Sequence, residues 1–472
     1  DHEEEARDEV ENSDSTTEGS AFGVTWMGER SFVGIALSNF ASNYGIPGGH
    51  EHEEDDDSML PAVPPLTGIV PALDEEEEEI VRIDLEQRRI DVKGGIGFDA
   101  FFEDVRFRLA DNDYEHTEFE GDEVGTVFET DGFDGRVELR HRPANGFEGA
   151  VGVQYKRIDF NAVGDEAYVP GSDTRRTSFF LFEEFSVSEN FVLQGSLRTE
   201  KQTIDGATLA IDYDDSAFGA AIGAIWQWGD NHSVAAHYSS TQRHPNSTEL
   251  YAEGTHVAVQ RFERGSVVLG QGILNKERSD NIDLTFRGNT EKFDWTLTFF
   301  NNDVEDYIVL APTAEIEDDF QVFEFQQTDA ELYGFEAEMR VELLDIDDRQ
   351  HLHTRLFSDY VHGEETGSGN YLPRLPPLRF GAGLHYTINN VEASVEAISY
   401  QKQTKTATNE LPTDSYTMVN AELSYAMDDK GLFLFLKGRN LGDEDARQHA
   451  SPLKDLVPLP GRALQAGVRF EF

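Results

Sequence analysis

The sequence predicts an all-β fold, a transmembrane antiparallel β-barrel, and three observations support this class. Residues 464–472 alternate apolar side chains with polar side chains or glycine, and the chain ends on Phe472. Because successive side chains of a strand point to opposite faces, this alternation suits a wall between lipid and a wet lumen. The 33 Phe and 15 Tyr could supply the aromatic girdles of a barrel. No apolar run is long enough for a transmembrane helix.

The same two-residue period recurs in other segments. Residues 105–109 alternate three apolar residues with two arginines, and residues 335–343 alternate apolar residues with three glutamates and one arginine. Residues 282–287 and 432–439 repeat the pattern. The apolar set would face lipid and the charged set would line the lumen. A large soluble β protein is the less favoured alternative, because each apolar face would then need a second sheet to cover it.

About 19 strands are predicted in order along residues 1–472, which we interpret as one barrel domain; the first visible strand covers residues 21–26. Short connections, assigned to the periplasmic side, are predicted at residues 27–29, 94–97, 143–146, 188–190, 229–231, 288–292, 345–349, 389–390 and 428–431. They alternate with long polar segments, assigned to the extracellular side, at residues 44–79, 115–126, 163–175, 205–215, 245–277, 311–322, 362–375, 404–414 and 442–460.

The direction of the strands predicts that the barrel is incomplete. If the C-terminus is periplasmic, the last strand and the first visible strand run in the same direction, so the two cannot close an antiparallel sheet. At least one outward strand is therefore expected before residue 1, and residues 1–20 are expected to form the extracellular loop after it. No signal peptide is visible, so Asp1 is interpreted as a processed or truncated start.

The composition excludes several functions. Lys and Arg number 38 against 92 Asp and Glu, and the net charge of −54 repels nucleic acid and attracts cations. Adaptation to a saline habitat, or simple solubility, explains much of this excess. The absence of cysteine removes thiolate metal sites and disulfides. No nucleophile elbow, metallohydrolase motif or phosphate loop is present, so neither catalysis nor a catalytic cofactor is expected.

Two groups of motifs resemble signatures of TonB-dependent receptors. The first group lies in the middle of the chain and comprises RHP at residues 243–245, ELYA at 249–252, Gly254, His256 and LNKE at 274–277. The second group comprises RNL at residues 439–441 and PGR at 460–462, before the terminal aromatic strand. The resemblance implies a 22-stranded barrel around an N-terminal plug, of which the plug, the TonB box and the first three strands are absent from these residues.

The resemblance also implies a location and partners. Such a receptor would lie in the cell outer membrane of a Gram-negative bacterium, surrounded by outer-membrane lipid, and is expected to be a monomer. The inner-membrane TonB, ExbB and ExbD complex would energise transport by acting on the missing plug.

The expected substrate is a metal ion, and the first long loop supports this. His50, Glu51, His52 and Glu53 begin an acidic run, and imidazole with carboxylate suits zinc and similar divalent cations. We interpret the run as a capture loop. The sequence YGIPG at residues 44–48 before the run, and DYEHTE at 113–118, resemble the zinc-uptake branch of the family. Candidates for a more ordered site near strand ends are Glu115, His116, Glu249 and His256.

Eight of the 14 histidines map to the extracellular side: His2, His50, His52, His116, His244, His256, His362 and His449. Taken alone, each of them could instead be a solvated loop histidine or the hydrogen-bonded partner of a loop carboxylate, and outside His50 and His52 this alternative is favoured. The predicted function is TonB-dependent uptake of zinc or a similar divalent cation. One alternative is uptake of a metal chelate such as a siderophore or haem, which would use pockets lined by aromatic residues and arginine. The other is a passive porin.

Overall fold

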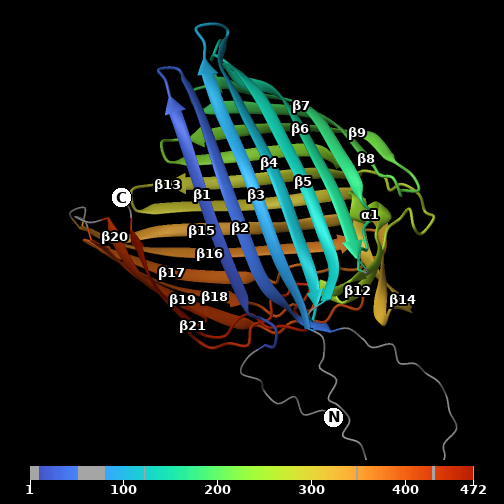
Figure 1. The fold of residues 1–472 in the computed structure, drawn as a ribbon. Helices are drawn as coiled ribbons and strands as arrows, with labels where there is room; N and C mark the ends of the chain where they lie inside the picture. The colour runs from blue at the N-terminus through green and yellow to red at the C-terminus, as the bar shows by residue number, and fades with distance from the viewer. Residues whose placement is uncertain are drawn as a thin grey trace, which may run out of the picture.

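The computed structural model describes residues 10–50, 80–121, 123–164, 166–346, 349–427 and 431–470. In this part of the chain 21 strands form one sheet, which confirms the predicted fold class (Figure 1). The strands are β1 Ser15–Met27, β2 Ser31–His50, β3 Ile80–Gly97, β4 Phe102–Glu120, β5 Glu123–His141, β6 Phe147–Gly164, β7 Ser172–Ser188, β8 Phe191–Asp205, β9 Tyr213–Trp228, β10 His232–Arg243, β11 Glu253–His256, β12 Arg261–Arg264, β13 Glu277–Asn289, β14 Phe293–Glu317, β15 Phe320–Ile346, β16 Gln350–Glu365, β17 Arg379–Ile388, β18 Val391–Tyr400, β19 Tyr416–Met427, β20 Leu432–Arg439 and β21 Ala463–Phe470.

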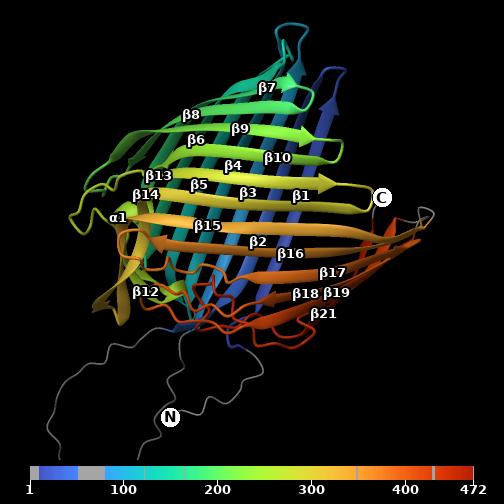
Figure 2. The ribbon, with the colours of Figure 1, turned by 180° about the vertical axis from the view of Figure 1, so that it is seen from behind.

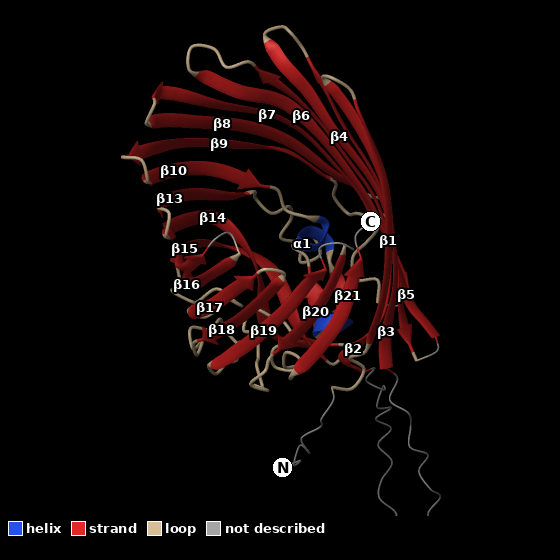
Figure 3. Cartoon of the chain, turned by 90° about the vertical axis from the view of Figure 1, so that its left-hand side faces the viewer, coloured by secondary structure: helices blue, strands red, loops and turns tan. Residues whose placement is uncertain are grey.

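Nineteen of these strands are long, and each pairs antiparallel with the next long strand. The other two, β11 and β12, have four residues each and belong to the connection between β10 and β13. The long strands curve around a central space, as the view in Figure 3 shows. No helix of the described residues has the length and apolar character needed to cross a membrane.

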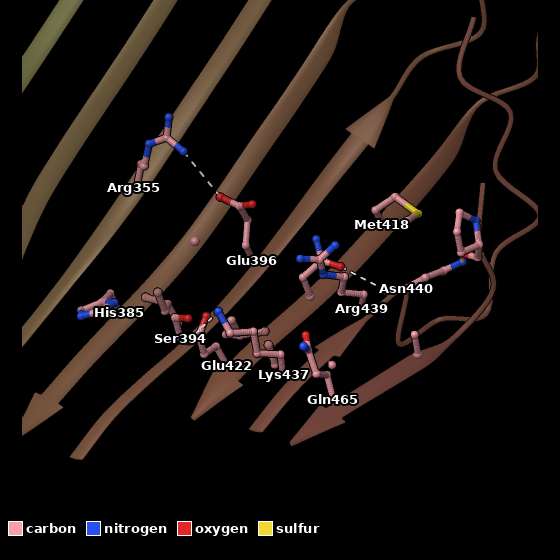
Figure 4. Close-up of a pocket in the computed structure, with 18 of the residues that line it drawn as sticks. Arg355, His385, Ser394, Glu396, Met418, Glu422, Lys437, Arg439, Asn440 and Gln465 are labelled. Atoms are coloured by element: carbon pink, nitrogen blue, oxygen red, sulfur yellow. Dashed lines mark hydrogen bonds and ion pairs between the residues drawn. The ribbon is translucent and has the colours of Figure 1, made fainter. Parts of the chain in front are cut away.

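The two faces of the sheet differ as the alternation predicts. On the apolar face Phe22 of β1 and Leu464 of β21 are each 72% exposed, as expected of side chains that meet lipid. On the other face charges are paired. Figure 4 shows this face near β21, where Lys437 lies 3.1 Å from Glu422 and a hollow of about 930 Å³ opens beside the two side chains. This charged face therefore lines the interior.

The short connections gather at one end of the sheet, which we call the turn side, and the opposite end is the loop side. Most predicted turns coincide with breaks between strands, but the turn predicted at residues 94–97 is wrong, because these residues continue β3 and the chain turns at 98–101. The glycines in this part of β3 leave space for aromatic rings of the neighbouring strands. Gly94 pairs with Phe107, and a Cβ on Gly94 would lie 2.5 Å from that ring.

Several predicted loops are also wrong, because the strands run further on the loop side. Most of 115–126 belongs to β4 and β5, most of 311–322 belongs to β14 and β15, and residues 15–20 belong to β1 rather than to a loop. In the sequence these strand ends lack the alternation of apolar and polar side chains, because both faces of the sheet contact water beyond the membrane. Ion pairs also occur at this end of the sheet; for example, Arg82 of β3 lies 2.9 Å from Asp14, the residue before β1.

The first and last strands run in the same direction, from the loop side to the turn side, and no ladder of the described residues joins β1 to β21. The sheet is therefore open between these two strands. The further strands expected there stay a prediction.

Residues 244–276, which we call the bridging segment, fold inward on the loop side. The segment contains α1 Ser247–Tyr251, β11, the short 3₁₀ helix η1 Val257–Val259 and β12. Val257 packs against Ile46, Val81 and Ile83 of β2 and β3, whereas β12 pairs in parallel with β15. Figure 3 shows α1 within the ring of strands, and Figure 2 shows α1 and β12 at the loop-side end from behind. The segment thus crosses the loop-side opening.

Candidate functional site

Glu249, a predicted ligand, belongs to the structural start of α1. Asn246 caps this helix, and its side chain accepts a hydrogen bond from the Glu249 backbone at 2.8 Å. In return, the Glu249 carboxylate accepts hydrogen bonds from the Asn246 backbone at 2.8 Å and from Arg243 Nη1 at 3.0 Å. This reciprocal arrangement is a capping box. The structure therefore uses Glu249 to fix the beginning of the bridging segment, and it does not bring Glu249 together with His256.

His256 lies in a second cluster of the bridging segment. Its Nδ1 donates to Glu263 Oε1 at 3.0 Å, and Arg261 Nη2 lies 2.7 Å from the same oxygen. Glu263 is only 2% exposed. Although burial opposes ionisation, the hydrogen bond from His256 and the charge of Arg261 lower the pKa of Glu263 below its ordinary value. The Glu263 carboxylate is therefore ionised and buried.

His116 lies at the loop-side end of β4, on the interior face. Its ring stacks on Phe128 of β5 at 4.5 Å, and its Nε2 lies 3.9 Å from Glu118 Oε1. Its Nδ1 is buried and has no hydrogen-bond partner among the described residues. One ring nitrogen of His116 therefore lies near a carboxylate, and the other has no hydrogen-bond partner among the described residues.

Glu166 approaches Glu118 from the connection between β6 and β7. Thr126 of β5 is paired with both Glu118 and Gly164, and its hydroxyl accepts a hydrogen bond from the Glu166 backbone at 3.0 Å. Gly164 has φ +147°, and a Cβ there would lie 2.1 Å from the Gly125 carbonyl oxygen, so only glycine allows this close turn. The close turn brings the Glu166 side chain to Glu118, and its hydrogen bonding lowers the pKa of Glu118 against the larger effect of burial.

This carboxyl pair lies outside the membrane. The 19 residues of β4 extend about 60 Å, more than twice the apolar band of about 25 Å in such barrels, and Glu118 is two residues from the loop-side end. Burial raises the pKa of Glu118, and burial lowers the pKa of His116. Both shifts favour the uncharged forms of these two side chains. We call His116, Glu118 and Glu166 the carboxyl–imidazole cluster.

Tyr168 connects this cluster with the cluster of His256. Its ring stacks on the His256 ring at 4.8 Å, and its carbonyl oxygen accepts a hydrogen bond from the Glu253 backbone at 2.7 Å. Burial, followed by the charges of Glu263 and Glu118, raises the pKa of Tyr168 to about 12. The phenol is therefore a proton donor at any physiological pH, placed between two acidic groups.

The other predicted residues lie apart from these clusters. Glu115 precedes His116 on β4, so the two side chains point to opposite faces; Glu115 stands on the outer face, paired with Glu86 and Glu129. His50 is the last residue of β2, and Glu51, His52 and Glu53 lie outside the described residues. His2 is outside them too. The described histidines assigned to the extracellular side all lie on the loop side: His50 at the end of β2, and His116, His244, His256, His362 and His449.

Across the described ranges, no three His, Asp or Glu side chains already surround one point as metal ligands. The carboxyl–imidazole cluster offers two carboxyl groups and one imidazole, and His116 would have to rotate to complete a ligand set. The sequence contains a signal for Glu118, since residues 116, 118 and 120 share one face of a strand. The sequence gives no such signal for Glu166 and Tyr168, because both residues lie in a connection between strands and not on a strand face.

Comparison with known proteins agrees with this architecture. The chain is similar to the vitamin B12 transporter BtuB of Photobacterium profundum, with 21% identity over 352 residues, 72% of this chain and 51% of that protein. It therefore spans about half the length of this relative. Among solved structures, the copper transporter OprC gives a TM-score of 0.79 at 15% identity, covering 97% of this chain and 72% of that chain. The FrpB iron transporter of Neisseria meningitidis (F3-3 variant) gives 0.71 at 12% identity, with the same coverage.

The antiparallel sheet, with an apolar outer face and a charged inner face, has the architecture of a transmembrane β-barrel. The family model described as "TonB dependent receptor-like, beta-barrel" matches residues 24–441, which is most of the chain. The chain belongs to this family.

Proposed function

We propose that the chain is the barrel of a TonB-dependent receptor in the outer membrane of a Gram-negative bacterium, and that it takes up zinc or a similar divalent cation. The observation that carries the proposal is the contact between the Glu118 and Glu166 carboxyl groups beside His116. A divalent cation can replace the proton that such a pair shares, and imidazole with carboxylates is a ligand set of zinc. The TonB, ExbB and ExbD complex would energise release inward.

The predicted residues take different parts in this proposal, and Glu115, on the outer face, takes none. His116 binds the cation directly, with Glu118 and Glu166. His256 supports the cluster through its stacking on Tyr168, and Glu249 supports it by capping α1. The run from His50 to Glu53 stays a predicted capture loop that raises the local ion concentration above the site. A passive porin is less well supported, because the bridging segment crosses the opening.

Substitutions within the cluster test the proposal. His116→Ala and Glu118→Gln should each weaken zinc binding at least about 100-fold, because even the loss of an outer-shell partner costs about 10- to 100-fold. His256→Ala should weaken it less than about tenfold. Calorimetric titration of the protein in detergent measures these affinities. A matched control is His351→Ala, which removes another histidine beside a carboxylate, 3.1 Å from Asp345 on the turn side. Equal zinc affinity in wild type and His116→Ala would place the site elsewhere.

The pH dependence of binding follows from the two pKa shifts. The lowered pKa of His116 keeps its imidazole neutral below pH 6.5, whereas the raised pKa of Glu118 keeps a proton on the carboxyl pair above the ordinary range of glutamate. Zinc must displace this proton, so affinity should hold near neutral pH and fall as the solution becomes acidic. Calorimetry on the acidic side of neutral pH, in buffers of different ionisation enthalpy, should detect release of a proton when zinc binds. In Glu118→Gln the release should disappear; a release that persists there would assign the proton to another group.

A further inference from the structure

The lipid face of the sheet carries a groove of about 780 Å³ across β14 to β19, strands that lie side by side in Figure 2. Short side chains leave the space, and long apolar side chains border it. The short ones include Ala337, Ala382 and Ala397, and the long ones include Trp295, Met339 and Phe380. They belong to the lipid face, because Glu338, which follows Ala337, pairs with Arg355 on the interior at 2.9 Å. The groove is therefore open to the acyl chains of the bilayer.

The loop-side end of the groove meets the edge of the apolar band. Ser358 of β16 lines the groove, and Tyr360 and His362 follow on the same face of the strand, with about 7 Å between successive positions. Tyr360 is level with Phe299 of β14 across β15, whereas His362 is level with Asn301. The face thus changes from apolar to polar between Tyr360 and His362.

Lys405, in the connection between β18 and β19, places its ammonium at this boundary. Its Nζ donates hydrogen bonds to the Tyr360 hydroxyl at 2.9 Å and to His362 Nδ1 at 3.4 Å. The nearby carboxylate of Glu364 is paired instead with His362 Nε2, at 3.1 Å. The groups that act on the Lys405 charge are tyrosine phenols, and no carboxylate in the described part of the chain forms an ion pair with it. An ammonium has three donors, so one N–H is left for a ligand.

A second groove on the lipid face lacks such a cation. It has a volume of about 480 Å³ and lies across β7 to β10. At its loop-side end Ser240 pairs with Asp280 of β13, and Asp280 forms an ion pair with Arg278 at 3.2 Å. The charges at the end of this groove are therefore already paired, unlike that of Lys405.

We propose that the larger groove binds an acyl chain of a membrane lipid whose phosphate headgroup is held by Lys405. The occupant is a lipid because the groove opens on the lipid face, and its headgroup is anionic because the ammonium at the boundary lacks a carboxylate partner. A phosphate oxygen would accept a short, charge-assisted hydrogen bond from Nζ. The lipid would lie in the leaflet on the loop side, and its headgroup would fix the connection at residues 401–415 to the membrane surface.

Native mass spectrometry of the protein in neutral detergent, titrated with two lipids, tests this site. Dipalmitoyl phosphatidic acid and dipalmitoylglycerol carry the same chains and differ in the phosphate. Wild type should bind the first at least about tenfold more tightly, and Lys405→Gln should lower that affinity about 10- to 100-fold, the usual value of a hydrogen bond to a charged group. Its affinity for dipalmitoylglycerol should not change. Lys402→Gln is the matched control, since it removes a neighbouring lysine that is paired with Asp414 at 2.8 Å; it should bind as wild type does.

A second pair of variants tests the groove itself. Ala382→Leu fills the larger groove with an apolar side chain that the lipid face tolerates, and it should weaken binding of both lipids. Ala220→Leu fills the second groove in the same way and should leave phosphatidic acid binding by the larger groove unchanged.

Four outcomes would overturn the proposal. Equal binding of the two lipids by wild type, or unchanged phosphatidic acid binding in Lys405→Gln, would remove the role of the ammonium. Displacement of phosphatidic acid by an equal concentration of inorganic phosphate would assign the site to a soluble anion. A dimer of wild type that Ala382→Leu dissociates would show that a second copy of the chain covers the groove instead.

Discussion

Replacing Gly334 with valine should destabilise the barrel by about 3 kcal/mol or more, the upper part of the range for overpacking. Gly334 lies in β15 and pairs with Phe300 of β14 and Val361 of β16. A Cβ at this position would lie 2.0 Å from the Tyr360 carbonyl oxygen and 2.7 Å from the Phe300 ring. Because the nearest atom belongs to the backbone, no side-chain rotation can relieve the clash, and the ladder between β15 and β16 must separate.

A urea folding titration in detergent measures this cost. The matched control is Gly367→Val, because Gly367 has no atom within 4 Å of its ideal Cβ position and should tolerate the change. Similar midpoints for wild type and Gly334→Val would show that the strands around β15 are not packed as described.

Arginine on the lipid face should have the second large effect. Leu434 and Val468 pair across β20 and β21 on the apolar face. Leu434→Arg or Val468→Arg should cost about 2 to 4 kcal/mol, since an arginine at the bilayer midplane must leave water. Gln465 faces the interior, opposite Lys437, where water and charges are present (Figure 4). Gln465→Arg should therefore cost much less.

Folding titrations into lipid bilayers compare the three variants under one condition. Equal losses for Leu434→Arg and Gln465→Arg would mean that the two faces of β21 are assigned the wrong way round.

The alternation of side chains was sufficient to predict most of the fold. It located nineteen long strands and most turns, because each strand within the membrane separates lipid from water. The alternation did not predict the strands where one face no longer contacts lipid. Beyond the membrane both faces are wet, so the loop-side ends of β4, β5, β14 and β15 resembled loops. It also failed at Gly94, where glycine makes room for the Phe107 ring instead of forming a turn.

The candidate site was predictable only in part. His116 was expected to be a ligand because of its position near a strand end, and the structure places it beside the carboxyl group of Glu118. Its neighbour Glu115 was grouped with it, although adjacent residues of a strand face opposite ways. Glu249 resembled a ligand in sequence, yet the capping box of α1 uses its carboxylate. Glu166 comes to the cluster through Gly164 and Thr126, and local sequence patterns do not reveal such a contact.

The position of a bound zinc ion tests the central claim most directly. Zinc-loaded protein would be studied by anomalous diffraction at the zinc absorption edge, with X-ray absorption spectroscopy to count the ligands. The account predicts one ion on the loop side, with a nitrogen of His116 at about 2.0–2.1 Å and oxygens of Glu118 and Glu166 at about 2.0–2.2 Å. Zinc bound away from these three residues, or no ordered zinc at saturating concentration, would contradict it.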